Sequence, residues 1–423
     1  MSKVDGEPDV AASTPVAGLR IEQVLDSKTE DVVPDRPAAR MLLLGTIGFM
    51  VNFWAWALIS PLGAAYRNLL HLTGFQQSVL VAVPVLVGSL GRIPIGALTD
   101  RFGARVMFPT VTALTIAPVL FVGLVAETYP SLLIGGFFLG LGGTAFAIGV
   151  PLVSSWYAPA RRGTALGIFG IGMGGTAISA FTTVRLTDRL GHQAPFLIVA
   201  AVLATYAVVA AILVRDAPGR STPQGSFLVR TWSTVKLPAT GQLSALYAVS
   251  FGGFVAFSVY LPTYLSNAFG LAPNDAAVRT AGFVVLAVAM RPVGGWLSDR
   301  YTAVRVLLTA FVVAGLLAAL ASVGLPLVPI GTATFLGLAA MLGAASGATF
   351  ALVGRLAPSG KVGAVTGIVG AAGGLGGFVP PLVMGAAFDL FKDYSIGLAL
   401  LAVVCLGAAL LTRGPVRRSA LKN

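Results

Sequence analysis

The sequence predicts an all-α polytopic membrane protein, in which twelve transmembrane helices form two pseudo-symmetric bundles of six. Three observations lead to this fold class. The 423 residues are 56% hydrophobic and only 10% charged, whereas a soluble domain carries about 25% charged residues. Apolar runs long enough to cross a bilayer as helices recur along nearly the whole chain. Several motifs of the first half then return in the second. Such continuous runs argue against the alternating strands of a β-barrel.

The apolar runs place twelve spans in chain order. They lie near residues 41–65, 78–98, 107–126, 131–156, 164–187, 194–214, 242–266, 276–297, 303–323, 328–354, 362–387 and 395–412. Residues 1–39 are polar and mixed in charge, so we expect a disordered tail and no cleavable signal peptide. The longest connection, 215–240, separates six spans from six. It predicts a linker between an N-terminal bundle at 40–214 and a C-terminal bundle at 241–412, with a tail at 413–423.

The basic residues predict which side of the membrane each connection faces. Of the 28 lysines and arginines, 21 lie in the two tails and in every second connection, and five lie in the alternate connections. We expect a protein of the inner membrane. By the positive-inside rule, both of its termini and its linker face the cytoplasm. The net charge of +12 therefore reflects topology, and this distribution argues against nucleic acid as a partner.

An internal repeat supports the division into two halves. The pattern R-x-x-x-G-x-L-x-D-R-[FY] occurs at 92–102 and again at 291–301. Equivalent pairs at nearly the same offset are Phe53/Phe254 with Pro61/Pro262, Ala158-Pro159/Ala357-Pro358, and Gly167/Gly367 with Gly170/Gly370 and Gly174/Gly374. Parallel repeats of six spans are typical of secondary transporters, which bind substrate between the halves near the middle of the membrane.

Arg92 and Arg291 are the strongest candidates for a substrate site. Each precedes the end of its span by seven residues or so, which places it about 10 Å inside the membrane. A buried arginine is costly and usually functional, yet none of the 16 Asp and Glu residues falls well inside a span. A small anion would complete both charges, because the planar guanidinium suits flat oxyanions. The alternative is a packing role, with carbonyls or water as partners.

Three aromatic residues are further candidates. Phe146 lies in span 4, and Tyr247 and Phe251 lie four residues apart on one face of span 7. Their rings could sandwich a planar anion, and the tyrosine hydroxyl could donate to it. On spacing alone, ordinary helix packing is the better explanation, because the chain has 24 phenylalanines.

Glycine-rich segments in spans 5 and 11 occupy equivalent positions of the two halves. The residues singled out are Gly170, Gly174, Gly370 and Gly374. Small residues let helices approach closely and expose backbone groups to a ligand. Packing alone, and packing combined with substrate contact, both explain them.

The Asp-Arg pairs that end spans 2 and 8 favour a structural or gating role at the cytoplasmic surface. They are Asp100 with Arg101 and Asp299 with Arg300. Enzyme motifs, a Walker A sequence and a metal-binding cluster are absent from the sequence. We therefore expect no catalytic residues, no metal and no cofactor, and an ATP-driven pump is disfavoured.

These residues resemble the major facilitator superfamily, and within it the nitrate/nitrite porter family. The superfamily part rests on the twelve spans, the linker and the motif G-x-L-x-D-R-[FY]-G at 96–103. Gly91-Arg92-Ile93-Pro94 and Arg291-Pro292 resemble the family's two substrate arginines. Segment 143–147 with Phe146, the pair Tyr247 and Phe251, and the glycine-rich spans 5 and 11 resemble its other site segments. In one departure, Met173 stands where the family usually has asparagine.

The resemblance implies nitrate held between two arginines and stacked aromatic rings, with the two halves rocking around it. We therefore expect a secondary active transporter of nitrate, nitrite or both, working by alternating access in the lipid bilayer as a monomer. Exchange is favoured, because no carboxylate or histidine lies mid-membrane to carry a proton. The alternatives are proton-coupled nitrate uptake, an exchanger of small carboxylates, and a membrane anion sensor without flux.

Overall fold

A computed structural model of the chain describes residues 36–218, 232–356 and 362–422. The predicted disordered tail lies outside the described residues up to position 35, as does most of the predicted linker, 219–231. Residues 41–423 form one compact unit.

The first half contains spans 1 to 6. Its elements are α2 (Arg36–Trp56), α3 (Ile59–Leu70), α4 (Gly74–Leu90), α5 (Arg92–Phe102), α6 (Ala104–Leu124), α7 (Tyr129–Leu139), the 3₁₀ turn η1 (Gly140–Thr144), α8 (Ala145–Trp156), α9 (Pro159–Phe169), the 3₁₀ turn η2 (Gly170–Gly174), α10 (Gly175–Leu190) and α11 (Ala194–Leu213). Two helix N-termini are capped by side chains. Thr73 caps α4 and Thr128 caps α7, each in a reciprocal capping box.

The second half contains spans 7 to 12. Its elements are α13 (Pro238–Phe269), α14 (Pro273–Tyr301), α15 (Ala303–Ala321), the π-turn η3 (Leu327–Gly331), α16 (Thr332–Leu356), α17 (Val362–Gly376), α18 (Val379–Phe391), α19 (Ser395–Leu411), η4 (Thr412–Val416) and α20 (Arg417–Lys422). The repeat extends to the backbone between spans, because Gly103 and Thr302 both have positive φ, 87° and 94°.

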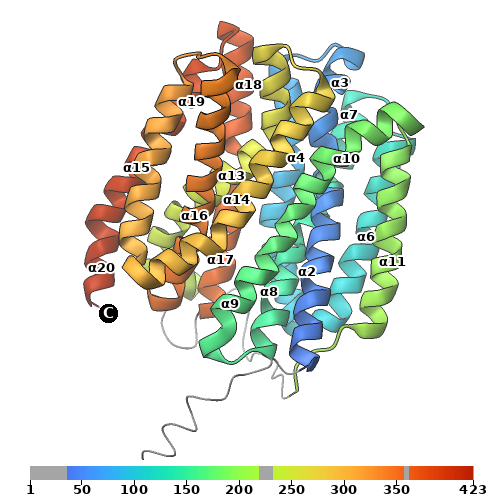
Figure 1. The fold of residues 1–423 in the computed structure, drawn as a ribbon. Helices are drawn as coiled ribbons and strands as arrows, with labels where there is room; N and C mark the ends of the chain where they lie inside the picture. The colour runs from blue at the N-terminus through green and yellow to red at the C-terminus, as the bar shows by residue number, and fades with distance from the viewer. Residues whose placement is uncertain (1–35, 219–231, 357–361, 423) are drawn as a thin grey trace, which may run out of the picture. The chain divides into compact units, whose positions relative to one another are not determined.

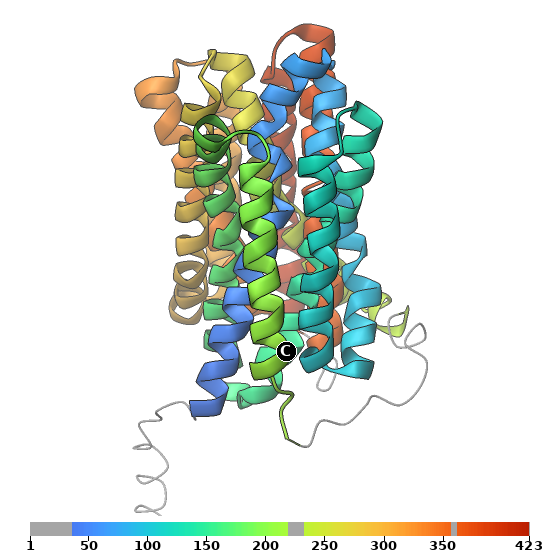
Figure 2. The same ribbon diagram turned by 90° about the vertical axis from the view of Figure 1, so that its right-hand side faces the viewer.

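The predicted fold class is confirmed, with twelve helices in the described residues that are long and apolar enough to cross a membrane. Figures 1 and 2 show them lying lengthwise beside one another, with the first half in blue to green and the second in yellow to red. Two predicted boundaries were wrong. Helix α2 begins at Arg36, inside the predicted tail, and the last span continues as helix to Lys422. These extensions contain Arg, Ala, Leu and Lys, which are strong helix formers although Arg and Lys are polar. A boundary drawn from hydropathy therefore stops before the helix does.

Besides span 1, which is interrupted between α2 and α3, three spans of the first half change geometry near their middle, whereas their repeats do not. Helix α4 gives way to α5 at Gly91, and η1 and η2 interrupt spans 4 and 5. The equivalent segments of α14, α16 and α17 remain α-helical. Glycine has low helix propensity, and a tighter 3₁₀ turn redirects carbonyls away from the α-helical pattern. These distortions surround Arg92, whereas Arg291 lies within the continuous helix α14. The local backbone of the two arginines therefore differs although the repeat relates their positions.

The two halves meet along symmetry-related helix pairs. Helix α4 packs on α18 and α10 packs on α14, which are images of one another under the repeat, and α3 packs on α13. Near the connection between α3 and α4, side chains bond across this boundary. Ser60 donates to the carbonyl of Val259, Gln77 donates to Thr263 at 3.2 Å, and Ser78 donates to Tyr260 at 3.2 Å.

Candidate anion-binding site

Arg92 lies at the start of α5, where its side chain points between the two halves. The residue is 7% exposed. Its Nε donates to the carbonyl of Gly143 in η1 at 3.3 Å, and its Nη1 donates to the carbonyl of Gly370 in α17 at 2.8 Å. The first bond stays within one half and the second crosses to the other. Arg92 therefore links the halves through neutral backbone acceptors.

Arg291 approaches the same region from α14 and is half-buried. Its Nη2 donates to the hydroxyl of Tyr247 in α13 at 2.9 Å. Its Nη1 contacts the thioether sulfur of Met173, which η2 contributes from the first half. Arg291 is thus held by one hydroxyl of its own half and one sulfur atom of the other.

One aromatic ring lies beside both guanidinium groups. The Cζ atom of Arg92 is 5.8 Å from the ring centre of Phe251, and that of Arg291 is 5.4 Å from it. Phe251 stacks on Tyr247 with ring centres 4.8 Å apart and planes 3° apart. The ring centre of Phe146 lies 5.1 Å from the Cζ atom of Arg92. Cation–π contacts of this kind are worth about 0.5–2 kcal/mol, so the rings help to hold the arginines in place.

Glycines of α17 allow its backbone to reach these side chains. A methyl group at Gly370 would press on the Phe146 ring, and one at Gly374 would overlap Ser89 and approach the Arg92 Nη1. A methyl group at Gly373 would overlap the rings of Tyr247 and Phe251. The structure therefore brings Gly370 and Gly374 into the cluster formed by Arg92, Arg291 and the three predicted aromatic residues.

Span 5 contributes differently from span 11. A methyl group at Gly170 or Gly174 would meet no atom within 4 Å, whereas Gly172 and Gly175 are pressed against the backbone and rings of α2. The residue of this segment that reaches the arginines is Met173. Gly170 and Gly174 thus border open space beside Met173, and the structure shows no contact between them and Arg92 or Arg291.

The partners of both guanidinium groups are neutral carbonyls, a hydroxyl, a sulfur atom and aromatic rings. The eight carboxylates within the described residues are Asp100, Glu127, Asp188, Asp216, Asp275, Asp299, Asp389 and Asp393, and they lie at helix ends or in connections. Neutral acceptors satisfy N–H groups but leave the positive charge uncompensated. The arrangement can therefore accept a small anion.

Comparison with known proteins decides the family. The sequence model of the Major Facilitator Superfamily matches residues 45–271 and 243–423. The chain is 49% identical over 392 residues to the "Probable nitrate/nitrite transporter NarK2" of Mycobacterium tuberculosis, covering 91% of this chain and 99% of that one. The chain belongs to the nitrate/nitrite porter family of the major facilitator superfamily.

Other relatives of this porter agree with that assignment. It is 37% identical to the "Nitrite extrusion protein" of Bacillus subtilis, over 88% of this chain and 92% of the relative. It is 35% identical to the "Probable nitrate transporter NarT" of Staphylococcus haemolyticus, over 86% and 93%. Among solved structures, a bacterial homologue of the lysosomal transporter Spinster, in an inward-facing conformation, matches with a TM-score of 0.68 at 18% identity, covering 92% of the porter and 98% of that chain. That match supports the fold alone.

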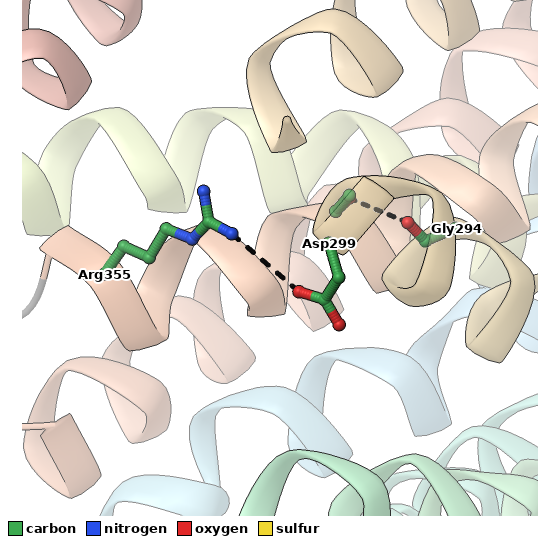
Figure 3. A network of polar contacts seen from close by, with 4 residues as sticks. Gly294, Asp299 and Arg355 are labelled. Carbon is green, nitrogen blue, oxygen red and sulfur yellow. Dashed lines mark hydrogen bonds and ion pairs between the residues drawn. The ribbon is translucent and has the colours of Figure 1, made fainter. Parts of the chain in front are cut away.

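The Asp-Arg ends of the porter's repeat lie away from the arginine cluster. Asp299 pairs with Arg355 of α16 at 3.8 Å, and Figure 3 shows the pair joining two helices of the second half. Both side chains are largely exposed, at 79% and 53%, so the pair contributes at most about 1 kcal/mol. Asp100 is half-buried at the end of α5, and the Cζ atoms of Arg101 and Arg300 lie over rings of their own helix ends.

Sequence reasoning did not place three residues, Ser89, Gly373 and Met173, in the arginine cluster. Ser89 lies one turn before Arg92 on the same face, which helical spacing could have indicated. Gly373 belongs to the glycine-rich run already singled out, and only its contact with Tyr247 distinguishes it. Met173 was noticed as a departure from the family pattern, but its contact with Arg291 depends on how the two halves pack.

Proposed function

We propose that this porter carries nitrate and nitrite across the cytoplasmic membrane, with both termini in the cytoplasm. The observation that carries the proposal is the pair of guanidinium groups flanking one aromatic ring, with only neutral partners. Nitrate and nitrite are small, flat and singly charged, so they suit planar N–H forks and aromatic faces. The names of the relatives support the same substrates. As proposed, one porter chain forms the complete transport unit.

The proposed mechanism is alternating access, in which residues 40–214 and 241–412 move as two bundles around the arginines. Arg92 and Arg291 each contact a residue of the opposite half, Gly370 and Met173 respectively. An entering anion would compete for these N–H groups and replace weak contacts between the halves with charge-assisted ones. We propose that Gly170, Gly174, Gly370 and Gly374 line the path, and that Asp100, Arg101, Asp299 and Arg300 influence gating at the cytoplasmic surface.

We further propose exchange of nitrate for nitrite rather than proton symport. Among the side chains that the structure describes, Arg92 is the one buried charged group, and the carboxylates lie at the periphery. A group that carries a proton through the membrane would have to titrate in the site. An empty site also leaves two charges uncompensated, which hinders the return of the unloaded porter and favours obligatory exchange.

Counterflow into proteoliposomes tests this proposal. Vesicles loaded with nitrite should take up labelled nitrate without a pH gradient, and empty vesicles should take up little even when a pH gradient is imposed. Uptake driven by the gradient into empty vesicles would instead establish proton coupling. Uptake of formate or oxalate without nitrate would contradict the substrate assignment, and anion binding without any flux would indicate a sensor.

A carboxylate of the second half holds the outer ends of the two halves together. Asp389 in α18 accepts hydrogen bonds from the backbone N–H groups of Gly74 and Phe75, both at 2.6 Å. These are the first two residues of α4, where the helix dipole also favours a negative charge. The guanidinium of Arg67 lies 5.1 Å from the ring of the neighbouring Phe388. We propose that this contact must break for the porter to open outward.

Asp389→Asn should therefore increase the outward-open population by about tenfold, because an amide keeps one acceptor and turns an N–H donor toward another donor. The measurement uses Val259→Cys in a Cys405→Ser background, labelled from outside with an impermeant thiol reagent. Position 259 is buried, and its carbonyl accepts one of the hydrogen bonds between the two halves. Asp275→Asn, at an exposed carboxylate of α14, is the control. Equal labelling rates in both variants would contradict the role of Asp389.

A further inference from the structure

Met173 lies at the boundary between the two halves, beside the candidate substrate arginine Arg291. The residue is fully buried, with 0% exposure, in the 3₁₀ turn η2 of span 5. Its sulfur atom contacts Nη1 of Arg291, while Nη2 of the same guanidinium donates to Tyr247. The contact joins a residue of the first half to the candidate substrate arginine of the second.

The chemistry of a thioether limits what Met173 can do there. Its sulfur is a weak acceptor and has no hydrogen to donate. It can therefore occupy an N–H of Arg291 when no better acceptor is present, and an anionic oxygen displaces it readily. A side-chain amide at the same position would differ in both respects, because its oxygen accepts strongly and its nitrogen donates to a bound anion.

We infer that Met173 is a specificity-determining residue that occupies Arg291 in the empty site and offers the bound anion no hydrogen bond. The inference rests on the proposed function. Nitrate has three oxygens and nitrite has two, so a donor near position 173 would favour the anion with the additional oxygen. A thioether removes that advantage. Both anions are then held mainly by the arginines and Tyr247, and their affinities stay close, as an exchanger that binds each in turn requires.

Substitution of Met173 by glutamine provides the most direct test. Glutamine keeps the unbranched length of methionine and adds an amide donor. We expect the ratio of the nitrite KM to the nitrate KM to rise about three- to tenfold, the effect of one added hydrogen bond. Met173→Asn should shift the ratio in the same direction. Both constants come from counterflow with labelled nitrate, competed by each unlabelled anion in turn.

Met173→Leu separates specificity from packing. Leucine has a similar volume but removes the sulfur that contacts Arg291. The KM values for nitrate and nitrite should both fall by a similar factor, with their ratio unchanged. Met107→Leu, at a buried methionine of α6 away from the arginines, should leave both KM values at the wild-type level.

The possible outcomes distinguish this inference from the proposed function. If the wild-type porter exchanges both anions but neither amide variant changes the KM ratio, the role of Met173 is overturned and the proposed function stands. If the wild-type porter carries neither anion, the proposed function itself fails. For an amide variant that folds but does not transport, thermal stabilisation of the purified protein by each anion gives the same ratio. A ratio equal to that of the wild type again overturns the inference.

Discussion

Arg92→Lys and Arg291→Lys should each reduce nitrate transport by about a hundredfold or more while leaving expression close to that of the wild type. Lysine keeps the charge but loses the planar fork and two of the five N–H groups. Arg92 uses Nε and Nη1 for bonds to two different segments, and Arg291 uses both terminal nitrogens. An ammonium group cannot span either pair of partners and also bind an anion. Counterflow of labelled nitrate in proteoliposomes measures the loss.

The matched control for these variants is Arg185→Lys. Arg185 of α10 is half-buried, donates to the carbonyl of Phe181 in its own helix and lies over the Phe181 ring. Its replacement should leave transport unchanged, since the same chemical change is then made outside the candidate site. Wild-type uptake by either site variant would refute the assigned roles of the arginines. Loss of folded protein in size-exclusion chromatography would show instead that the arginines are structural.

Gly374→Ala is expected to reduce transport by about tenfold or more. The added methyl group would overlap the side chain of Ser89 and crowd the Nη1 atom of Arg92. Overpacking of this kind costs about 1–3 kcal/mol, and relief would require α17 to move away from α4. Because α17 also supplies the Gly370 carbonyl to Arg92, that movement would displace the arginine. The KM for nitrate should rise, measured by the same counterflow.

Gly367→Ala provides the comparison within the same helix. Gly367 lies two turns earlier in α17, is exposed, and has no atom within 4 Å of an added methyl group. Alanine is also the better helix former, so this variant should transport normally with equal or greater thermal stability. Equal loss in both variants would indicate that α17 requires flexible glycines throughout, rather than close approach at one position.

Much of the candidate site could be predicted from the sequence, because membrane burial makes charges conspicuous. Arg92 and Arg291 lie in apolar runs at matching positions of a repeat, so they were visible without coordinates. The repeat also related Gly370 to Gly170 and Gly374 to Gly174. It could not show that only Gly370 and Gly374 press on the arginine cluster, because that depends on the different windings of η2 and α17.

The gating prediction shows the same limit. The Asp-Arg motif predicted a structural or gating role for Asp299 and Arg300 but did not indicate their partners. In the structure, Asp299 pairs with Arg355, more than fifty positions away along the chain. The outer contact through Asp389 was not anticipated at all, since an aspartate that caps the helix of another half leaves no local pattern.

The membrane class, the twelve spans, the repeat and the two arginines can be predicted from the order of residues, because each follows from where water, lipid and charge can lie along a chain. The tertiary structure alone decided which neutral groups surround those arginines. Contacts between Arg92 and Gly370, and between Arg291 and Met173, join segments more than a hundred residues apart. Such contacts depend on helix windings and on the packing of two halves. Periodicity and hydropathy describe one helix at a time and contain no information about either.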